Sequence, residues 1–273
     1  MKGLSLAIHK DIRECVRRKK MLIFCLSALG VGLLVYVASM VLPVALENLL
    51  FLAPELLPGK DALSEVMSTF FPGDVRSSLA LLSSNLLTFY IIVMVIVSQN
   101  LLTSEFRKGR WDMPRANGYT SACLALSKCI VYSVAGSLPI FVVYILYYWA
   151  VSLSLVRNLS LGQALGHALI NMLCTAAVMC ITLFGSMVFK HSVVNVISVL
   201  GIILFVPDIL YFFSFSEYLP TYPFSFAKSV LLDFGSVIMP MVILILICAL
   251  FGVLGIYKYQ KRLKKSEFGE RND

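Results

Sequence analysis

Six long stretches of the chain contain almost no charged side chains and are dominated by aliphatic and aromatic residues. They are residues 21–44, 79–103, 129–156, 158–189, 193–207 and 234–257. A helix needs about 20 apolar residues to cross a bilayer core of about 30 Å. All but 193–207 reach that length unaided, and that stretch reaches it if Asp208 lies at its outer end and the apolar run 209–215 continues the helix. The pattern predicts a polytopic membrane protein with six spans.

Helices, rather than strands, are expected to form these spans. A backbone in lipid must satisfy its own hydrogen bonds, which leaves helices or a closed barrel. Barrel strands alternate in hydrophobicity over about 10 residues, whereas the apolar runs here are longer and unbroken. Because hydrophobic residues make up 59% of the 273 residues, little of the chain is left for a soluble domain. We predict a single all-α transmembrane domain over residues 1–273.

The charged residues alternate in sign from loop to loop. Basic residues gather before the first span, between spans two and three, between spans four and five, and after the sixth, whereas acidic residues dominate the first and last of the intervening loops. The basic residues are Lys10, Arg13, Arg17, Arg18, Lys19, Lys20, Arg107, Lys108, Arg110, Arg115, Lys128, Lys190, Lys258, Lys261, Arg262, Lys264 and Lys265. Lys and Arg mark the cytoplasmic side, which predicts a multi-pass protein of the plasma (inner) membrane with both termini cytoplasmic. The net charge of +8 therefore lies beside the lipid bilayer and does not indicate a nucleic-acid partner.

Residues 1–20 have the spacing of an amphipathic helix. Apolar side chains recur on one helical face, and Asp11 interrupts that face. The apolar positions are Leu4, Ile8, Ile12, Cys15 and Val16. A basic amphipathic helix beside a span is typical of the membrane interface. The alternative is a disordered basic tail that only sets the topology. The apolar stretch that follows is longer than the core of a signal peptide, so we expect the first span to be retained.

Residues 207–233 are rich in aromatic residues and prolines. A solvent loop would not expose so much apolar surface, and a continuous span would not hold Glu217, Pro220 and Pro223 together. We therefore expect a re-entrant outer hairpin before the last span, closing the outer end of a path. The candidate gate residues are Tyr218, Pro220, Tyr222, Pro223 and Phe224.

Uncharged polar residues occur inside the predicted spans. In lipid such groups need another helix or water as a partner. They serve either as contacts between helices or as the lining of a translocation path. The candidates for such a path are Asn85, Ser98, Gln99, Asn100 and Asn195.

Catalytic and metal-binding patterns are missing from the sequence. There is no HExxH, GxSxG or Walker motif, and no pair of intramembrane aspartates. His167 is the main ionisable residue of the spans, and we interpret it as a packed or interface histidine rather than a catalytic base. The seven cysteines show no CxxC or Cys/His ligand spacing, and none falls in a predicted extracellular loop. We expect no enzymatic activity, metal or cofactor in this chain.

The internal loop between spans two and three has an ordered pattern. It contains Trp111, Pro114 and the turn signal Asn117-Gly118, and Thr120 or Ser121 is placed to cap the next helix. Such a loop, over residues 104–120, is expected to dock a cytosolic partner.

This layout resembles the type-2 ABC transporter permeases of bacterial exporters. Members often carry an acid, a Gly about four residues later, a Pro-containing turn and a Lys leading into span three. Glu105, Gly109, Pro114 and Lys128 match that order, although Arg110 stands where the family often has Thr. The stretch 219–224 is also similar to the segment before the family's last span.

The resemblance implies a half-transporter. Two permease protomers, identical or related, would bind two copies of a separate ABC ATPase subunit, which would hold ATP and Mg. Residues 1–20 would be an elbow helix, and spans one, two and five would border the path. The cargo would be amphipathic or apolar, such as a peptide, a lipid or a drug. The residues implied to couple to the ATPase are Glu105, Phe106, Arg107, Lys108, Gly109, Arg110, Trp111 and Pro114.

Two other functions fit the sequence. The chain could be a non-transporting membrane scaffold or sensor for a cytosolic partner, or an intramembrane enzyme. ATPase activity that appears only with a cytosolic partner and depends on residues 105–114 would separate the transporter from both.

Overall fold

A computed structural model describes residues 2–41, 44–45, 48, 73–99, 101–102, 114, 117–189, 191–210 and 218–269. These residues are predominantly helical and contain no β-strand. The extended pairing among them is a single parallel bridge between Asp74 and Val156. The predicted all-α fold is confirmed.

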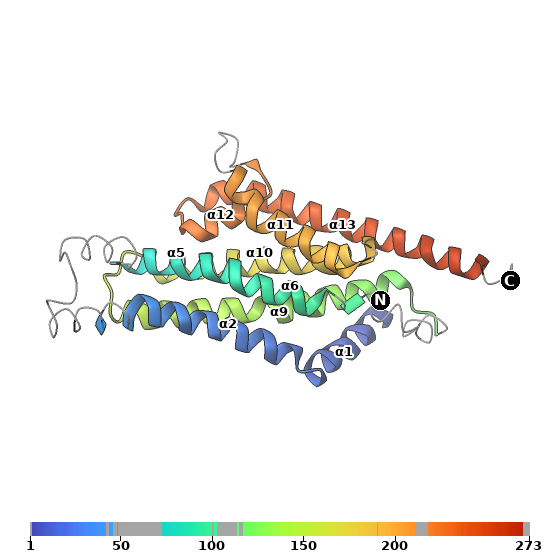
Figure 1. Cartoon of the computed structure of the whole chain (residues 1–273), viewed down its shortest axis with the longest axis horizontal. Coiled ribbons are helices and arrows are strands. Elements are labelled where there is room, and N and C mark those ends of the chain that lie inside the picture. The colour runs from blue at the N-terminus through green and yellow to red at the C-terminus, as the bar shows by residue number, and fades with distance from the viewer. Residues whose placement is uncertain are drawn as a thin grey trace.

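The long helices lie side by side along one axis (Figure 1). α5, η2 and α6 follow one another without a break, and η1 directly extends α2. In chain order the elements are α1 (Lys2–Arg17), α2 (Lys20–Tyr36), η1 (Val37–Val41), α5 (Val75–Asn85), η2 (Leu86–Tyr90), α6 (Ile91–Ser98), α9 (Ser121–Ser152), α10 (Leu161–Val188), α11 (Ser192–Leu210), α12 (Tyr222–Ser229) and α13 (Phe234–Gly269).

Five helical stretches have the length and composition of a membrane span. They are Lys20–Val41, Val75–Ser98, Ser121–Ser152, Leu161–Val188 and Phe234–Lys258. The remaining predicted span corresponds to α11, whose apolar part, Ser192–Val206, is shorter than the others. At 1.5 Å per residue that part covers about 22 Å of a core of about 30 Å. α11 does continue past Asp208, but only to Leu210 within the described residues. Five of the six predicted spans therefore have the required length among the described residues, and the span over α11 stays a prediction.

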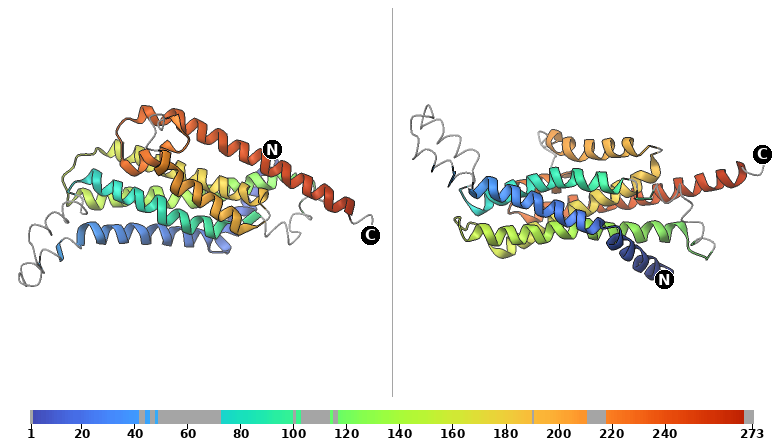
Figure 2. Two further views of the ribbon diagram at one scale, coloured as in Figure 1. Left: turned by 45° about the horizontal axis from the view of Figure 1, so that its top comes forward. Right: turned by 60° about the horizontal axis from the view of Figure 1, so that its bottom comes forward.

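The two ends of the bundle differ in what they carry (Figures 1 and 2). One end holds α1, the start of α9 and the C-terminal part of α13, and we call it the basic end. The opposite end holds the start of α5, the connection 153–160 and α12. α1 and the C-terminal part of α13 thus lie at the same end of the bundle.

Local signals set the start of the central helices. Gly118 has a φ of 86°, which a glycine adopts without strain, and it forms the predicted turn with Asn117. Thr120 then caps α9 by accepting a hydrogen bond from the Cys123 backbone N–H at 3.2 Å. Ser160 and Gln163 form a capping box at the start of α10.

α9 and α10 form the centre of the bundle. Of their most apolar windows, 61% and 67% of the residues are buried, against 22% for both α2 and α13. The outer helices keep apolar side chains exposed, such as Leu33 on α2 and Leu246 on α13. An apolar outer face around a packed centre is the arrangement expected of a helical bundle in lipid.

Candidate functional site

A buried cluster of charges joins α1 to α9 at the basic end. The Lys128 ammonium lies 3.2 Å from a carboxylate oxygen of Asp11 and 3.2 Å from one of Glu14. The Lys128 and Asp11 side chains are only 2% and 4% exposed. The Ser127 hydroxyl donates to the other Asp11 oxygen. We call Asp11, Glu14 and Lys128 the α1–α9 clamp.

The sequence spacing explains how the clamp forms. Asp11 and Glu14 are three residues apart on α1, so their side chains lie on one side of that helix. Lys128 follows the Thr120 cap by about two helical turns. Asp11 interrupts the apolar face of α1 because it faces this lysine. Sequence reasoning noted both residues but did not pair them. The signal that could have paired them was an acid on an apolar face beside a span that begins with a lysine.

Aromatic and backbone contacts extend the cluster to two more helices. The Lys128 and Lys20 ammonium groups lie 5.7 Å and 5.8 Å from the centre of the Tyr132 ring, within the range of cation–π attraction. Lys20 also donates to the Val97 carbonyl at 3.4 Å. The starts of α2 and α9, the end of α6 and α1 therefore converge on one charged site.

The predicted coupling residues fall mostly outside the described residues. The coupling residues outside the described part of the chain are 105–111. Pro114 is described, and its carbonyl accepts from the backbone N–H groups of Asn117 (3.2 Å) and Tyr119 (3.1 Å). The end of the loop is thus tied directly to the start of α9, two turns before Lys128.

Those candidate path residues that the structure describes make separate contacts. Asn85 and Ser98 each donate to a carbonyl of their own helix, at 2.8 Å and 2.5 Å. Gln99 is half-buried at the end of α6, and Asn100 lies outside the described residues. Asn195 is buried and donates across to the Thr182 carbonyl on α10 at 2.9 Å, which makes it a contact between α10 and α11.

Gly185 is what allows Asn195 to approach α10. A Cβ atom on this glycine would overlap the Asn195 side-chain oxygen. The two helices therefore pack closely at this point because one of them has no side chain.

Sequence reasoning missed a hydroxyl chain at the opposite end. The Tyr147 hydroxyl on α9 lies 2.9 Å from Ser39 of η1 and 2.7 Å from Ser78 of α5, and all three are buried. Asn171 on α10 similarly donates to Ser83 at 3.3 Å. These groups act as contacts between helices, and the individual residue types give no hint of which helices they join.

The candidate outer gate forms a short helix packed on the bundle. Tyr222, Pro223 and Phe224 on α12 are buried, Pro220 is half-buried, and Tyr218 is exposed. α12 packs against α5, α10 and α13.

Two contacts fix α12 in this position. The Arg76 side chain at the start of α5 donates to the Val230 carbonyl at 3.0 Å. The fully buried His167 ring stacks on Phe226, with centroids 5.4 Å apart, and lies 4.9 Å from the ring of Phe234. His167 is therefore a packed side chain, as interpreted from the sequence.

Asp74 organises the neighbouring surface of the opposite end. It caps α5 by accepting from the Ser77 backbone N–H at 2.8 Å, and the Asn158 amide also donates to it. Partial burial favours the neutral acid, but the hydrogen bonds from Ser77 and Asn158 outweigh this and lower the pKa of the Asp74 carboxyl. The start of α5 is thereby joined to the connection between α9 and α10.

No family model matches the chain, and no curated protein is significantly similar to it. The fold itself defines the class: an all-α, multi-pass membrane protein with an amphipathic helix clamped to its central span.

Proposed function

We propose that the chain is the membrane-spanning permease subunit of an ATP-driven exporter of the type-2 ABC kind. ATP and Mg would be held by a separate ATPase, present in two copies, and a second permease protomer would complete the transporter. The single observation that carries the proposal is the α1–α9 clamp, which links the amphipathic helix to the helix that follows the internal loop.

The clamp gives the basic end a way to transmit movement. The internal loop leads through Pro114 and the Thr120 cap straight into α9. A partner that displaced the loop would displace the start of α9. Because Lys128 is buried between two carboxylates, separating α1 from α9 would leave charges without partners, at a cost of several kcal/mol. α1 is therefore expected to move together with α9.

The chemistry of the spans supports an apolar or amphipathic cargo. The buried polar groups between the described spans are mainly hydroxyls and amides, such as those of Ser83, Tyr147 and Asn171. Spans with so few buried ionisable groups suit a peptide, a lipid or a drug better than a small ion. The packed aromatic helix α12 would close the outer end of the path and would open during release, which is a gating step.

Co-expression with a candidate ABC ATPase, one encoded beside this chain, tests the proposal. Replacing Arg110 and Trp111 together by Ala should abolish co-purification of the ATPase or uncouple its hydrolysis, because interfaces concentrate their energy in such anchors. The permease should still insert in the membrane. Trp149→Ala is a matched control, because Trp149 is exposed on α9 far from the loop.

The readouts are the yield of the complex and cargo-stimulated ATP hydrolysis in proteoliposomes. A complex of the double variant that stays intact with unchanged stimulated hydrolysis would refute the coupling role of this loop. A native complex that forms but moves no cargo would instead favour the scaffold or sensor.

A further inference from the structure

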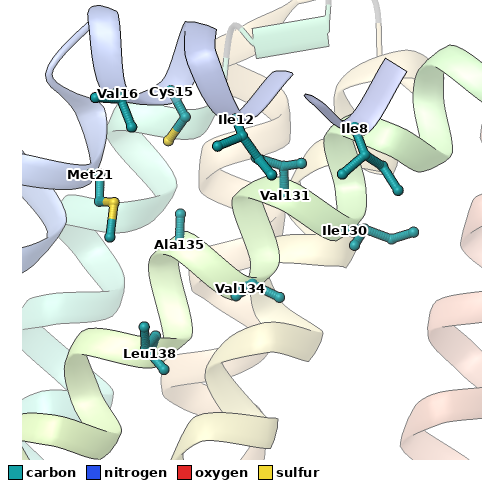
Figure 3. A pocket seen from close by; sticks show the side chains of 10 residues that line it. All are labelled: Ile8, Ile12, Cys15, Val16, Met21, Ile130, Val131, Val134, Ala135 and Leu138. Carbon is teal, nitrogen blue, oxygen red and sulfur yellow. The ribbon is translucent and has the colours of Figure 1, made fainter. Parts of the chain in front are cut away.

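An apolar notch lies between α1 and α9 at the basic end. Its volume is about 250 Å³. Figure 3 shows the side chains of α1 pointing across the notch toward α9, with Met21 of α2 at one end. The lining includes Ile8, Ile12, Val16, Met21, Val134 and Leu138.

The notch is lined by apolar groups and is open on one side. Its lining is aliphatic apart from the sulfur atoms of Cys15 and Met21. Burial raises the pKa of the Cys15 thiol, so this wall is also uncharged. Ile12 and Val134 remain 47% and 56% exposed. An apolar cleft with exposed walls at the level where a span begins would be in contact with lipid chains.

The turn that closes the notch carries consecutive basic residues. Arg17, Arg18 and Lys19 lie between the lining residues Val16 and Met21 and are exposed. Lys19 has a φ of 55°, a left-handed conformation, at the bend between α1 and α2 (Figure 1). Arg18 is paired with Glu14 at 2.5 Å. Cationic side chains thus stand directly beside the mouth of an apolar notch.

We propose that the notch binds one acyl chain of an anionic phospholipid, whose phosphate is held by the basic turn at Arg17 and Lys19. The two halves of the site match the two halves of such a lipid: an apolar cleft for the chain and positive charge for the headgroup. α2 enters its apolar stretch immediately after this turn, which sets the turn at headgroup depth. The bound lipid would hold α1 against α9 beside the clamp. This inference does not depend on the proposed transport function.

The experiment uses the full chain in nanodiscs of equal parts phosphatidylglycerol and phosphatidylcholine. A trace of phosphatidylglycerol with a photoactivatable diazirine in its acyl chain is added, the sample is irradiated, and labelled peptides are mapped by mass spectrometry. Labelling should concentrate in residues 8–16 and 130–138. The same probe on phosphatidylcholine should label these peptides less.

Two sets of variants test the acyl-chain part and the headgroup part of the site separately. Val134→Phe, which fills the notch, should remove labelling of residues 8–16, and Ile130→Phe, one turn earlier on α9, should do the same. Val142→Phe is the control, because Val142 is 45% exposed on the same helix but does not line the notch. Arg17→Gln with Lys19→Gln should lower labelling by phosphatidylglycerol about tenfold, to the level of phosphatidylcholine. Each variant is first checked for a single folded species by gel filtration.

Three results would overturn the proposal. Equal labelling by both lipids would show that the site does not select an anionic headgroup. Labelling of residues 8–16 that persists in Val134→Phe and Ile130→Phe would show that the chain does not occupy the notch. Labelling that falls as a dimer forms in mass photometry would assign the notch to a second copy of the protein.

Discussion

Several polar side chains in the interior of this protein have partners on other helices. Lys128 meets two carboxylates from α1, Asn195 reaches a carbonyl of α10, and Tyr147 joins hydroxyls from two neighbours. An unpaired polar group in an apolar interior is costly. These residues therefore define which helices lie together, and their removal has predictable effects.

Lys128→Met should strongly destabilise the protein. The substitution leaves the buried Asp11 carboxylate without its cation, whereas the half-buried Glu14 keeps its pair with Arg18. Loss of one partner of a buried pair typically lowers the free energy of unfolding by about 3–5 kcal/mol. Thermal melting in mild detergent measures the effect. Lys258→Met, at an exposed lysine of α13, should melt like the native protein.

A double variant tests whether the loss of stability comes from the ion pair between Asp11 and Lys128. Asp11→Asn combined with Lys128→Met should be less destabilised than the sum of the two single variants, with a coupling of about 0.5–3 kcal/mol. Strict additivity would mean that the two side chains do not interact.

Gly185→Ala should also be destabilising, through steric overlap. The added Cβ would collide with the Asn195 side-chain oxygen, and overpacking of this kind costs about 1–3 kcal/mol. Gly201→Ala is the matched control, since a Cβ at that position would meet nothing within 4 Å. Adding Asn195→Ala to Gly185→Ala should recover part of the loss in melting temperature. If the melting temperature does not recover, overlap with Asn195 is not the cause of the destabilisation.

Among the helices, α9 and α10 act as the fixed centre on which the others pack. α10 contacts both α9 and α13, and α1, α2 and α5 all contact α9. Both central helices begin with a side-chain cap. Movement during function is therefore expected at the outer helices and at α1 rather than between α9 and α10.

A cysteine pair reports directly on the α9–α10 contact. The sulfur atoms of Cys129 and Cys180 are 3.1 Å apart. A membrane-permeant oxidant such as diamide should join the two thiols in a disulfide, and its N=N bond takes up the two protons and two electrons released. Peptide mapping without reductant should find the bridge, and a thiol reductant should remove it.

Cys180→Ser should abolish this cross-link, and the buried Cys174 on the same helix should not form one in its place. A bridge from Cys174, or none from Cys129, would show that the two helices pack in another register.

At the scale of the whole molecule, α1 and the C-terminal part of α13 lie at one end of the bundle (Figure 1). Both segments are rich in basic residues. Positive charge marks the cytoplasmic side. In a cysteine-free background, single cysteines at Ser64 and Thr221 should react with an impermeant thiol reagent from outside intact cells, and one at Ser266 should react only after the membrane is opened. Labelling of Ser266 in intact cells would contradict this topology.

The local features of the fold were predictable from the sequence. The apolar stretches, the amphipathic spacing of residues 1–20, the cap at Thr120 and the turn at Gly118 depend on residues a few positions apart. Periodicity and capping are set within a few turns of chain, so these predictions hold without knowledge of tertiary contacts. The length of the span in 193–210 was less predictable, because it depends on where the helix ends.

The candidate site was predictable only in part. Pro114 lies in the turn before α9, where its carbonyl accepts from Asn117 and Tyr119, and its coupling role stays a prediction. The other predicted coupling residues, 105–111, fall outside the described part of the chain. The path residues Asn85 and Asn195 share the property of being polar in an apolar stretch, yet they belong to different contacts. Polarity alone indicates that a partner is needed and does not say which one.

The sequence by itself determined that this protein is a helical bundle of membrane spans, because burial of the backbone in lipid allows few alternatives once the apolar runs are long enough. Only the tertiary structure decided that Asp11 faces Lys128, that Gly185 admits Asn195, and that an apolar notch remains beside the basic turn. Each of these contacts joins residues from different helices. Their geometry follows from how the helices pack, and no local pattern along the chain encodes it.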